Sequence, residues 1–550
     1  MKRCLPHFSG KSVTQRITTF LKNIMLLSML FFFVNSAVAI DLSESYETLA
    51  NARSSFSDKS LAIKTIASSN SPEAALILEA LDHQKLFFHK HQGSLYIQTP
   101  QNSLVNVFDK TIYQGKPRDL KRVAINNQNR DTIALAIAMR AISDPNLTLE
   151  QRIASAHDLI GRVNSEDAQE LAGLRDLEYS KNPELAQMLS FVVAAADLDH
   201  EDPRIRNGAM RILEDFNSPL LIDKLDSIAK NDADTSNRVF ASQQVKSLKS
   251  KQDNYGYAET IFFGLSLGSV LVLAAIGLTI TFGVMGVINM AHGELMMIGA
   301  YTVFVMQQLM PNYPGVALLL SIPAAFCVSG IVGMIIERGV IHYLYGRPLE
   351  TLLATFGISL LLQQAVRSIF SALNRNVVIP DFMSGAIVIN DFFSITYNRL
   401  YIIFFCLAVF FLLRHILQHS RLGLEVRAVS QNRAMAQNMG VRSARVNALT
   451  FGLGSGIAGL AGVALSQLTN VGPNLGQNYI VDSFLVVVFG GAGNIWGTMV
   501  AGMSLGLANK ILEPISGAML AKIIILVFVI FFIQKHPRGL FPQRGRSVED

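Results

Sequence analysis

The sequence predicts an all-α protein in which a soluble, mainly helical domain precedes a polytopic helical membrane domain. Half of the 550 residues are hydrophobic and only 16% are charged, with a mean hydropathy of +0.34; soluble proteins carry about 25% charged residues. The charges are also uneven. Residues 40–253 hold 25 Lys and Arg against 30 Asp and Glu, whereas residues 254–550 hold 17 against 11. This pattern excludes a single soluble enzyme and a disordered chain.

The first 39 residues have the features of a secretory signal peptide. They contain five Lys and Arg and no acidic residue, followed by an apolar run over 24–34 and the small-residue pattern Ala37-Val38-Ala39. An uncleaved anchor helix is the alternative. Both interpretations export residue 40 onward.

Residues 40–253 predict a periplasmic domain of short helices. Apolar residues recur at helical spacing, and Ser71-Pro72 and Asp144-Pro145 mark helix boundaries. The expected helices cover 71–89, 131–143 and 149–162, and two helical pairs that resemble HEAT repeats cover 202–248. Only 94–113 suggests strands. The acids follow no metal-ligand spacing and no nucleophile motif occurs, so this domain is interpreted as an interaction module.

Residues 254–540 predict a membrane domain, because a span needs roughly 20 mostly apolar residues. About eight spans are expected, at 260–283, 288–310, 315–336, 350–372, 399–415, 447–469, 495–512 and 516–534. The run 480–491 is apolar but short, and Gly490-Gly491-Ala492-Gly493 ends it. It is interpreted as half of a broken or re-entrant segment, which membranes tolerate only where protein or a cavity surrounds it.

Positive charge assigns the loops to sides of the membrane. The loop 416–446 is rich in arginine, so it is predicted to be cytoplasmic, together with the loop 337–349 and the tail 541–550. The loop 373–398 is then expected outside. If residue 254 lies outside, the five predicted spans before residue 416 bring the chain into the cytoplasm there, as the charges require.

Two segments are unusual for a membrane domain. The segment 277–301 places Asn289, His292 and Glu294 within an apolar stretch, where polar groups need partners or a wet cavity. The segment 421–462 combines a basic loop with a Gly-rich and Ala-rich span. The loop predicts a short helix from about Glu425 to Met439, followed by Gly440 in the position of a helix-terminating glycine.

Together the two segments resemble the permeases of bacterial ABC importers in the branched-chain amino acid (LivH/LivM-type) family, over residues 255–540. The exported domain departs from the short amino acid permeases and resembles the longer permease subunits of urea importers. The resemblance implies an inner-membrane permease that is not an enzyme. It implies a paralogous permease subunit, two ATPase subunits that bind ATP and Mg²⁺, and a periplasmic solute-binding protein. No cofactor, metal or nucleic acid is expected in this chain.

The resemblance also implies two sets of functional residues. The expected contacts with the ATPase are Arg421, Gly423, Arg427, Ala428, Asn432, Ala436 and Gly440. The expected translocation path or gate contains Asn289, His292, Glu294, Gly491 and Gly493. Two structural alternatives remain open. The arginines could serve only membrane topology, and the three polar side chains could bond one another to brace an interrupted helix.

The cargo predicted by the resemblance is urea or a short amide, with a branched-chain amino acid as the alternative. Two other classes are weighed against this assignment. A secondary transporter or channel needs no loop that transmits motion from an ATPase, the role expected here of the loop 416–446, which is called the coupling loop below. A membrane-anchored sensor or enzyme does not need eight spans. The chain contains no GxxxxGK[ST] motif, so ATP hydrolysis must come from another subunit.

Overall fold

The computed structural model describes residues 42–541 except 52, 70, 91–92, 100–102, 116–118, 164 and 180. The predicted signal peptide and residues 542–550 of the predicted tail lie outside the described residues. The chain forms two compact units, divided between Lys246 and Ser247. The division falls within helix α11, which runs unbroken from Thr235 to Met285, so the predicted boundary at 253/254 also lies inside this helix.

Unit 1 consists of short helices joined by tight turns. Polar caps start several of them: Ser55 and Thr148 form capping boxes, and Asp202 caps a helix that begins with Pro203. The helices are α2 (Leu42–Ala50), α3 (Phe56–Ala67), α4 (Pro72–Asp82), α5 (Asn127–Ser143), α6 (Leu149–His157), α7 (Ser165–Glu178), α8 (Pro183–Asp197), α9 (Pro203–Ile212) and α10 (Ile222–Asn231).

A small antiparallel sheet interrupts this helical series. Its four strands pair in the order β3-β2-β1-β4, and they cover Leu86–His89 (β1), Leu95–Gln98 (β2), Leu104–Asn106 (β3) and Leu120–Arg122 (β4). The helix expected over 71–89 is therefore too long. It ends at Asp82, because Gln84 adopts a positive φ of 55° and the following Leu-Phe-Phe run pairs with β2. Strands within 94–113 were predicted correctly, whereas β1 and β4 were not.

Unit 2 is a bundle of long apolar helices with shorter helices between them. The first is α11, followed by α12 (His292–Leu309), α13 (Pro314–Gly339), α14 (Pro348–Phe370), α15 (Tyr397–His419), α16 (Arg421–Gln431), α17 (Arg433–Asn438), α18 (Ser443–Ser466), α19 (Gln477–Gly490), α20 (Ile495–Ser516) and α21 (Ala518–Lys535). Among the described residues, six helices are long and apolar enough to cross a membrane: α11, α13, α14, α15, α18 and α21. Helices α12 and α20 cover the other two predicted spans.

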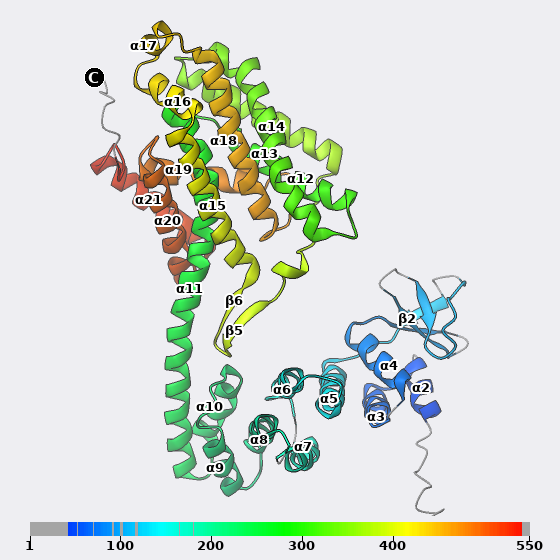
Figure 1. The fold of residues 1–550 in the computed structure, drawn as a ribbon. Coiled ribbons are helices and arrows are strands. Elements are labelled where there is room, and N and C mark those ends of the chain that lie inside the picture. The colour runs from blue at the N-terminus through cyan, green and yellow to red at the C-terminus, as the bar shows by residue number, and fades with distance from the viewer. Residues whose placement is uncertain are drawn as a thin grey trace, which may run out of the picture. The chain divides into compact units, whose positions relative to one another are not determined.

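Helix α18 lies at the centre of unit 2. It packs against α12 and α13, which precede it by more than 100 residues, and Figure 1 shows the orange α18 beside the green α12 and α13. Close approach requires glycine here. A Cβ on Gly299 of α12 would clash with Gly459 of α18, and a Cβ on Gly459 would lie 2.6 Å from the carbonyl oxygen of Ala325 on α13. The small residues of α18 thus bring three backbones together, as in other membrane bundles.

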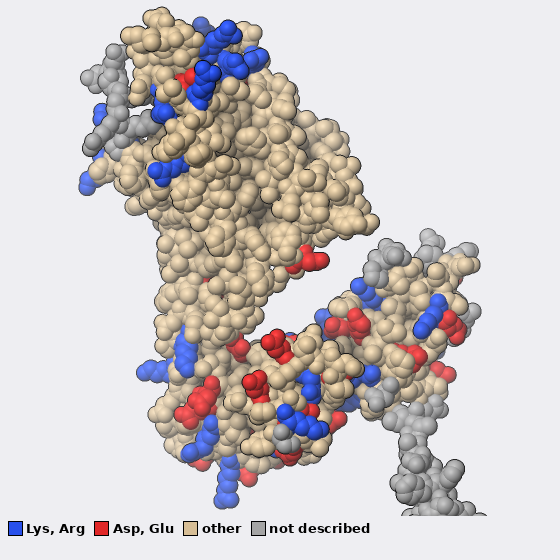
Figure 2. Space-filling model, in the orientation of Figure 1, with Lys and Arg blue, Asp and Glu red and all other residues tan. Residues whose placement is uncertain are grey.

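The visible face of unit 2 is mostly uncharged away from one end (Figure 2). Figure 2 shows Lys and Arg gathered at the end that carries α16 and α17, with neutral residues over most of the visible face. Unit 1 instead shows charges of both signs across its visible surface. The polytopic helical fold class predicted from composition is therefore confirmed. The loop 373–398 also holds a hairpin that was not predicted, with strands Ala386–Asn390 (β5) and Phe393–Thr396 (β6).

Candidate functional site

The first candidate feature is a break between α11 and α12. Helix α11 ends at Met285, Gly286 has a φ of +66°, and α12 begins only at His292. The span predicted over 288–310 is thus helical from His292 onward. Asn289 lies in the break with 2% of its surface exposed, and its Oδ1 accepts a hydrogen bond of 3.0 Å from the backbone N–H of Ala291.

His292 ties the start of α12 to α11. Its Nε2 lies 2.9 Å from the carbonyl oxygen of Ala274. Because a carbonyl can only accept, Nε2 carries the proton and Nδ1 presents a lone pair. Nδ1 has no hydrogen-bond partner among the described residues, although the side chain is completely buried.

Glu294 ties α12 to α14. Its Oε1 accepts hydrogen bonds from Ser359 Oγ at 3.0 Å and from Gln363 Nε2 at 2.7 Å. The side-chain hydrogen bonds described for Asn289, His292 and Glu294 therefore go to the local backbone, α11 and α14, and none joins these three residues to one another. The alternative in which these three side chains bond one another is therefore wrong, because each side chain bonds a different part of the fold. The helix break brings all three predicted residues into the buried interior.

The second candidate feature is the break between α19 and α20. Helix α19 ends at Gly490, and Gly491 and Gly493 adopt φ values of +101° and +82°, which only glycine accommodates readily. Asn494 then caps α20 by accepting hydrogen bonds from the backbone N–H groups of Trp496 at 3.0 Å and of Gly497 at 3.2 Å. Residues 490–494 thus form the interruption that the sequence predicted.

The coupling loop forms two helices rather than one. Asn432 separates α16 from α17 and caps α17 by accepting from the N–H of Met435 at 2.9 Å. Gly440 follows the end of α17 with a φ of +87°, as predicted for a terminating glycine. The single helix expected from Glu425 to Met439 is interrupted because the Asn432 side chain bonds the backbone of the following turn.

Exposure divides the residues predicted to contact the ATPase. Gly423 and Ala436 are buried within unit 2, Ala428 is partly buried, and the exposed members are Arg421, Arg427, Asn432 and Gly440. A Cβ on Gly423 would clash with the carbonyl group of Leu417 on α15. The buried members therefore position the loop.

Sequence reasoning missed three apolar side chains on the coupling helices. Leu424, Met435 and Met439 expose 61%, 60% and 80% of their surfaces. Contiguous patches of exposed apolar side chains often mark protein interfaces, so each of these three side chains is a candidate contact for a partner. Their signal in the sequence was their occurrence within an otherwise polar, arginine-rich loop.

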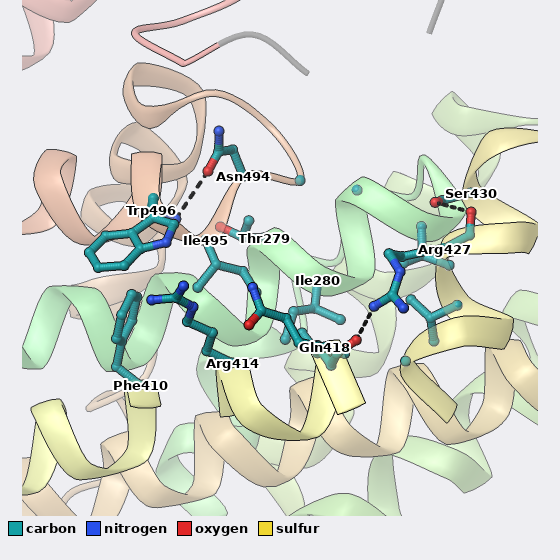
Figure 3. A pocket seen from close by; sticks show the side chains of 16 residues that line it. Thr279, Ile280, Phe410, Arg414, Gln418, Arg427, Ser430, Asn494, Ile495 and Trp496 are labelled. Carbon is teal, nitrogen blue, oxygen red and sulfur yellow. Dashed lines mark hydrogen bonds between the residues drawn. The ribbon is translucent and has the colours of Figure 1, made fainter. Parts of the chain in front are cut away.

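A groove connects the coupling loop with the α19–α20 break (Figure 3). Its volume is about 290 Å³, and its walls come from α11, α15, α16 and the start of α20. Gly423 and Arg427 line it from the loop and Gly493 lines it from the break. Arg427 donates from Nη1 to the carbonyl oxygen of Leu417. The structure thus places members of both predicted residue sets around one groove.

On another side of the loop, cationic side chains from two distant segments meet. Arg338, Arg442 and Arg445 line one cleft of about 430 Å³ with His342 and the acidic Glu337. Beside it, Tyr345 donates a hydrogen bond to the Glu337 carboxylate, and the Arg433 guanidinium lies 4.7 Å from the Tyr345 ring centre. Burial and this carboxylate raise the pKa of Tyr345. Tyr345 therefore links α17 to the end of α13.

Within the described ranges, no three His, Cys, Asp or Glu side chains form a potential metal site. The long apolar helices, the two helix breaks and the exposed basic loop define the class of the protein as a polytopic helical membrane protein. The model of the family described as "Branched-chain amino acid transport system / permease component" matches residues 260–533.

Known relatives agree with this match. The high-affinity branched-chain amino acid transport system permease protein BraD of Pseudomonas aeruginosa is 32% identical over 296 residues, covering 52% of this chain and 96% of the relative. The corresponding protein LivH of Escherichia coli K12 is 30% identical, with 52% and 95% covered. The ribose import permease RbsC of the same strain is 28% identical over 129 residues, 22% of this chain and 40% of its own length. No solved structure matches the chain.

The chain therefore belongs to the branched-chain amino acid permease family of ABC importers. Members of this family are transport permease subunits rather than enzymes, which agrees with the prediction that this chain is not an enzyme. The match places the chain in a membrane as a multi-pass protein.

Proposed function

We propose that residues 254–540 form one half of the translocation path of an ABC importer, with the α11–α12 and α19–α20 breaks in or beside the path. The observation that carries this proposal is the burial of Asn289, His292 and Glu294 at an interrupted helix. Buried polar groups are costly within a membrane and commonly mark a transport pathway.

The coupling loop then receives the motion of the ATPase subunits. The exposed side chains Arg421 and Arg427 offer polar contacts, and Leu424, Met435 and Met439 offer apolar ones. The groove around Gly423 and Gly493 gives a direct physical connection from this loop to the α19–α20 break. The partners in this proposal are a second, paralogous permease subunit, two cytoplasmic ATPase subunits and a periplasmic solute-binding protein.

The proposed topology places residues 40–253 in the periplasm, after a signal peptide, and places the loop 416–446 and the C-terminus in the cytoplasm. Fusions of a reporter that is active only outside the cytoplasm test this topology. A fusion near residue 250 should be active and a fusion near residue 430 should be inactive. The reverse pattern would overturn the assignment of sides.

The names of the relatives favour a branched-chain amino acid as cargo over urea. Urea remains a second candidate because of one observation. BraD and LivH are covered over 95% or more of their own length but match only about half of this chain. The proposed exported domain, residues 40–253, therefore has no counterpart in them. A long exported extension is the feature that resembles urea-importer permeases.

Uptake of labelled leucine and labelled urea by a strain that lacks this chain decides between the two cargos. Loss of leucine uptake alone would support the amino acid. Loss of urea uptake at low-micromolar concentration, with rescue at high urea, would support urea because a small neutral molecule also leaks across bilayers. Normal uptake of both solutes by the deletion strain would contradict both assignments.

A further inference from the structure

The buried face of α14 is polar, although the helix is apolar enough to span a membrane. The residues of this face recur every fourth position, so they lie on one side of the helix. They are Thr351, Thr355, Ser359 and Gln363, called here the α14 polar face. The opposite side exposes large apolar residues such as Leu353 and Leu361, with 71% and 66% of their surfaces accessible. Helix α14 is thus polar inside and apolar outside.

The α14 polar face contacts the break before α12 and the first turn of α12. The backbone N–H of Met290 donates to Thr355 Oγ1 at 3.2 Å. One and two turns further along α14, Ser359 and Gln363 both donate to Glu294 Oε1. Side chains such as Ser, Thr and Gln can hold membrane helices together by hydrogen bonds alone. A buried carboxyl group in a membrane domain is costlier than such packing requires, so Glu294 at this seam between α12 and α14 points to a function beyond packing.

Two buried polar atoms in the break and the first turn of α12 have no hydrogen-bond partner among the described residues. They are Oε2 of Glu294, which can accept when the carboxyl group is ionised, and Nδ2 of Asn289, which can only donate. Met290, the neighbour of Asn289, contacts Thr355, whereas Glu294 contacts Ser359. These two levels of α14 are four residues apart, or about 6 Å along the helix. The break and the first turn of α12 thus offer an unpaired acceptor and an unpaired donor next to residues that contact the α14 polar face.

We propose that the α14 polar face, with Glu294 and Asn289, is the solute-binding surface of the translocation path. It would take a small solute that carries N–H donors for Glu294 and an oxygen acceptor for Asn289. The amide groups of urea and the ammonium and carboxylate groups of an amino acid share this chemistry. When α12 and α14 separate at the seam, the hydroxyl and amide groups of α14 become available to the solute. This inference rests on the permease function proposed above.

The test uses the complete importer reconstituted in proteoliposomes, with uptake of labelled leucine and labelled urea as separate measurements. Ser359→Ala and Gln363→Leu each remove one hydrogen-bonding side chain from the α14 polar face. Ser368→Ala and Gln364→Leu are matched controls, because they make the same substitutions at exposed positions of the same helix. Each buried variant should raise KM for the transported solute about tenfold, the loss expected for one hydrogen bond, while both controls keep the wild-type KM.

Glu294→Gln separates solute binding from simple bracing of α12, because it replaces an acceptor by a donor at nearly constant size. Solute binding predicts a changed ratio of KM values for the transported solute and its fully N-methylated analogue, which lacks N–H donors. An unchanged ratio would overturn the assignment of the polar face alone. The same conclusion would follow if all three variants kept the wild-type KM while the wild type transports normally. Uptake of neither solute by the wild-type importer would overturn the proposed cargo, and the solute class assigned to this surface with it.

Discussion

The two units of this chain both bury apolar cores, but they differ in the residues that they expose and in the polar groups that they bury. Unit 1 buries an apolar core that includes Leu49, Ile63 and Leu81, and exposes charges of both signs. Unit 2 buries the polar groups of α14 and α12 and exposes apolar side chains such as Phe531 and Leu353. The difference follows from the solvent. Water rewards apolar burial, whereas lipid leaves close backbone packing and polar contacts to hold helices together.

Helices α14 and α18 show two roles within unit 2. Helix α18 is buried along nearly its whole length, with small residues that admit neighbouring backbones. Helix α14 is buried only along its polar face. Helix α18 thus serves close packing, and helix α14 carries the candidate solute surface.

The largest expected effect tests close packing in unit 2. In Gly459→Leu, the new side chain would meet the backbone of Ala325 and the side chain of Ser329 at less than 3 Å. Overpacking of this kind against backbone cannot be relieved by rotamer changes. We expect loss of the folded permease, measured as loss of the monodisperse peak in detergent. Gly357→Leu on α14 is the control, since nothing lies within 4 Å of its Cβ position. Equal behaviour of both variants would contradict the packing role of α18.

A smaller effect tests the charge network of unit 1. Asp232 is buried and accepts hydrogen bonds from Arg206 at 2.7 Å and from the N–H of Asp234 at 2.8 Å. Asp232→Asn should destabilise the unit by about 3 kcal/mol, because it leaves the Arg206 charge without its partner. Thermal unfolding followed by limited proteolysis measures the loss. Asp199→Asn is the control, because this carboxylate is 64% exposed where it pairs with Lys224 and should cost less than about 1 kcal/mol.

The same network has a defined pH dependence. Hydrogen bonding from Arg206 holds the pKa of Asp232 at about 2, below its usual value near 4. A lowered folded-state pKa gives stability that is complete above the unfolded pKa and is lost as the pH falls through the folded pKa. The wild type should therefore lose this contribution between about pH 4 and pH 2, and Asp232→Asn should show a flatter stability profile there. Parallel profiles would contradict the assignment.

A third effect tests the coupling loop. Gly440 has a φ of +87° with nothing within 4 Å of its Cβ position, so a substitution acts through backbone strain alone. Gly440→Val should lower ATP-dependent uptake about tenfold while leaving expression and membrane insertion intact. Gly517→Val is matched for strain, with a φ of +82° and equally open space, but lies between α20 and α21. A coupling role requires that only the Gly440 variant separates ATP hydrolysis from uptake.

The smallest effect is expected at the surface. Arg347 and Glu350 form an ion pair of 3.1 Å with 65% and 55% of their side chains exposed. Exposed pairs contribute about 0–1 kcal/mol. Glu350→Gln should leave thermal stability and uptake within error of the wild type. A clear loss of uptake would show that the loop 337–349 has a role in coupling that its exposure does not suggest.

The sequence alone determined the fold class and the position of the break between α19 and α20. These features are local. A span needs a continuous apolar run, and a break needs glycines or polar residues within one segment, as at 490–494. The break that contains Asn289 was instead predicted as part of a span over 288–310. The exposed coupling loop was also visible in its arginines. By contrast, the β1 strand was predicted as helix, because its apolar pattern is compatible with both structures until its partner strand is known.

Only the tertiary structure decided which residues meet. The sequence marked Glu294, but its partners Ser359 and Gln363 lie 65 or more residues away and had no individual signal. Likewise, only packing shows that Gly423 and Ala436 are buried while Leu424 and Met439 are exposed. The composition and periodicity of each segment reflect the solvent that surrounds it. Hydrogen bonds between distant helices depend on how those helices pack, which no single segment encodes.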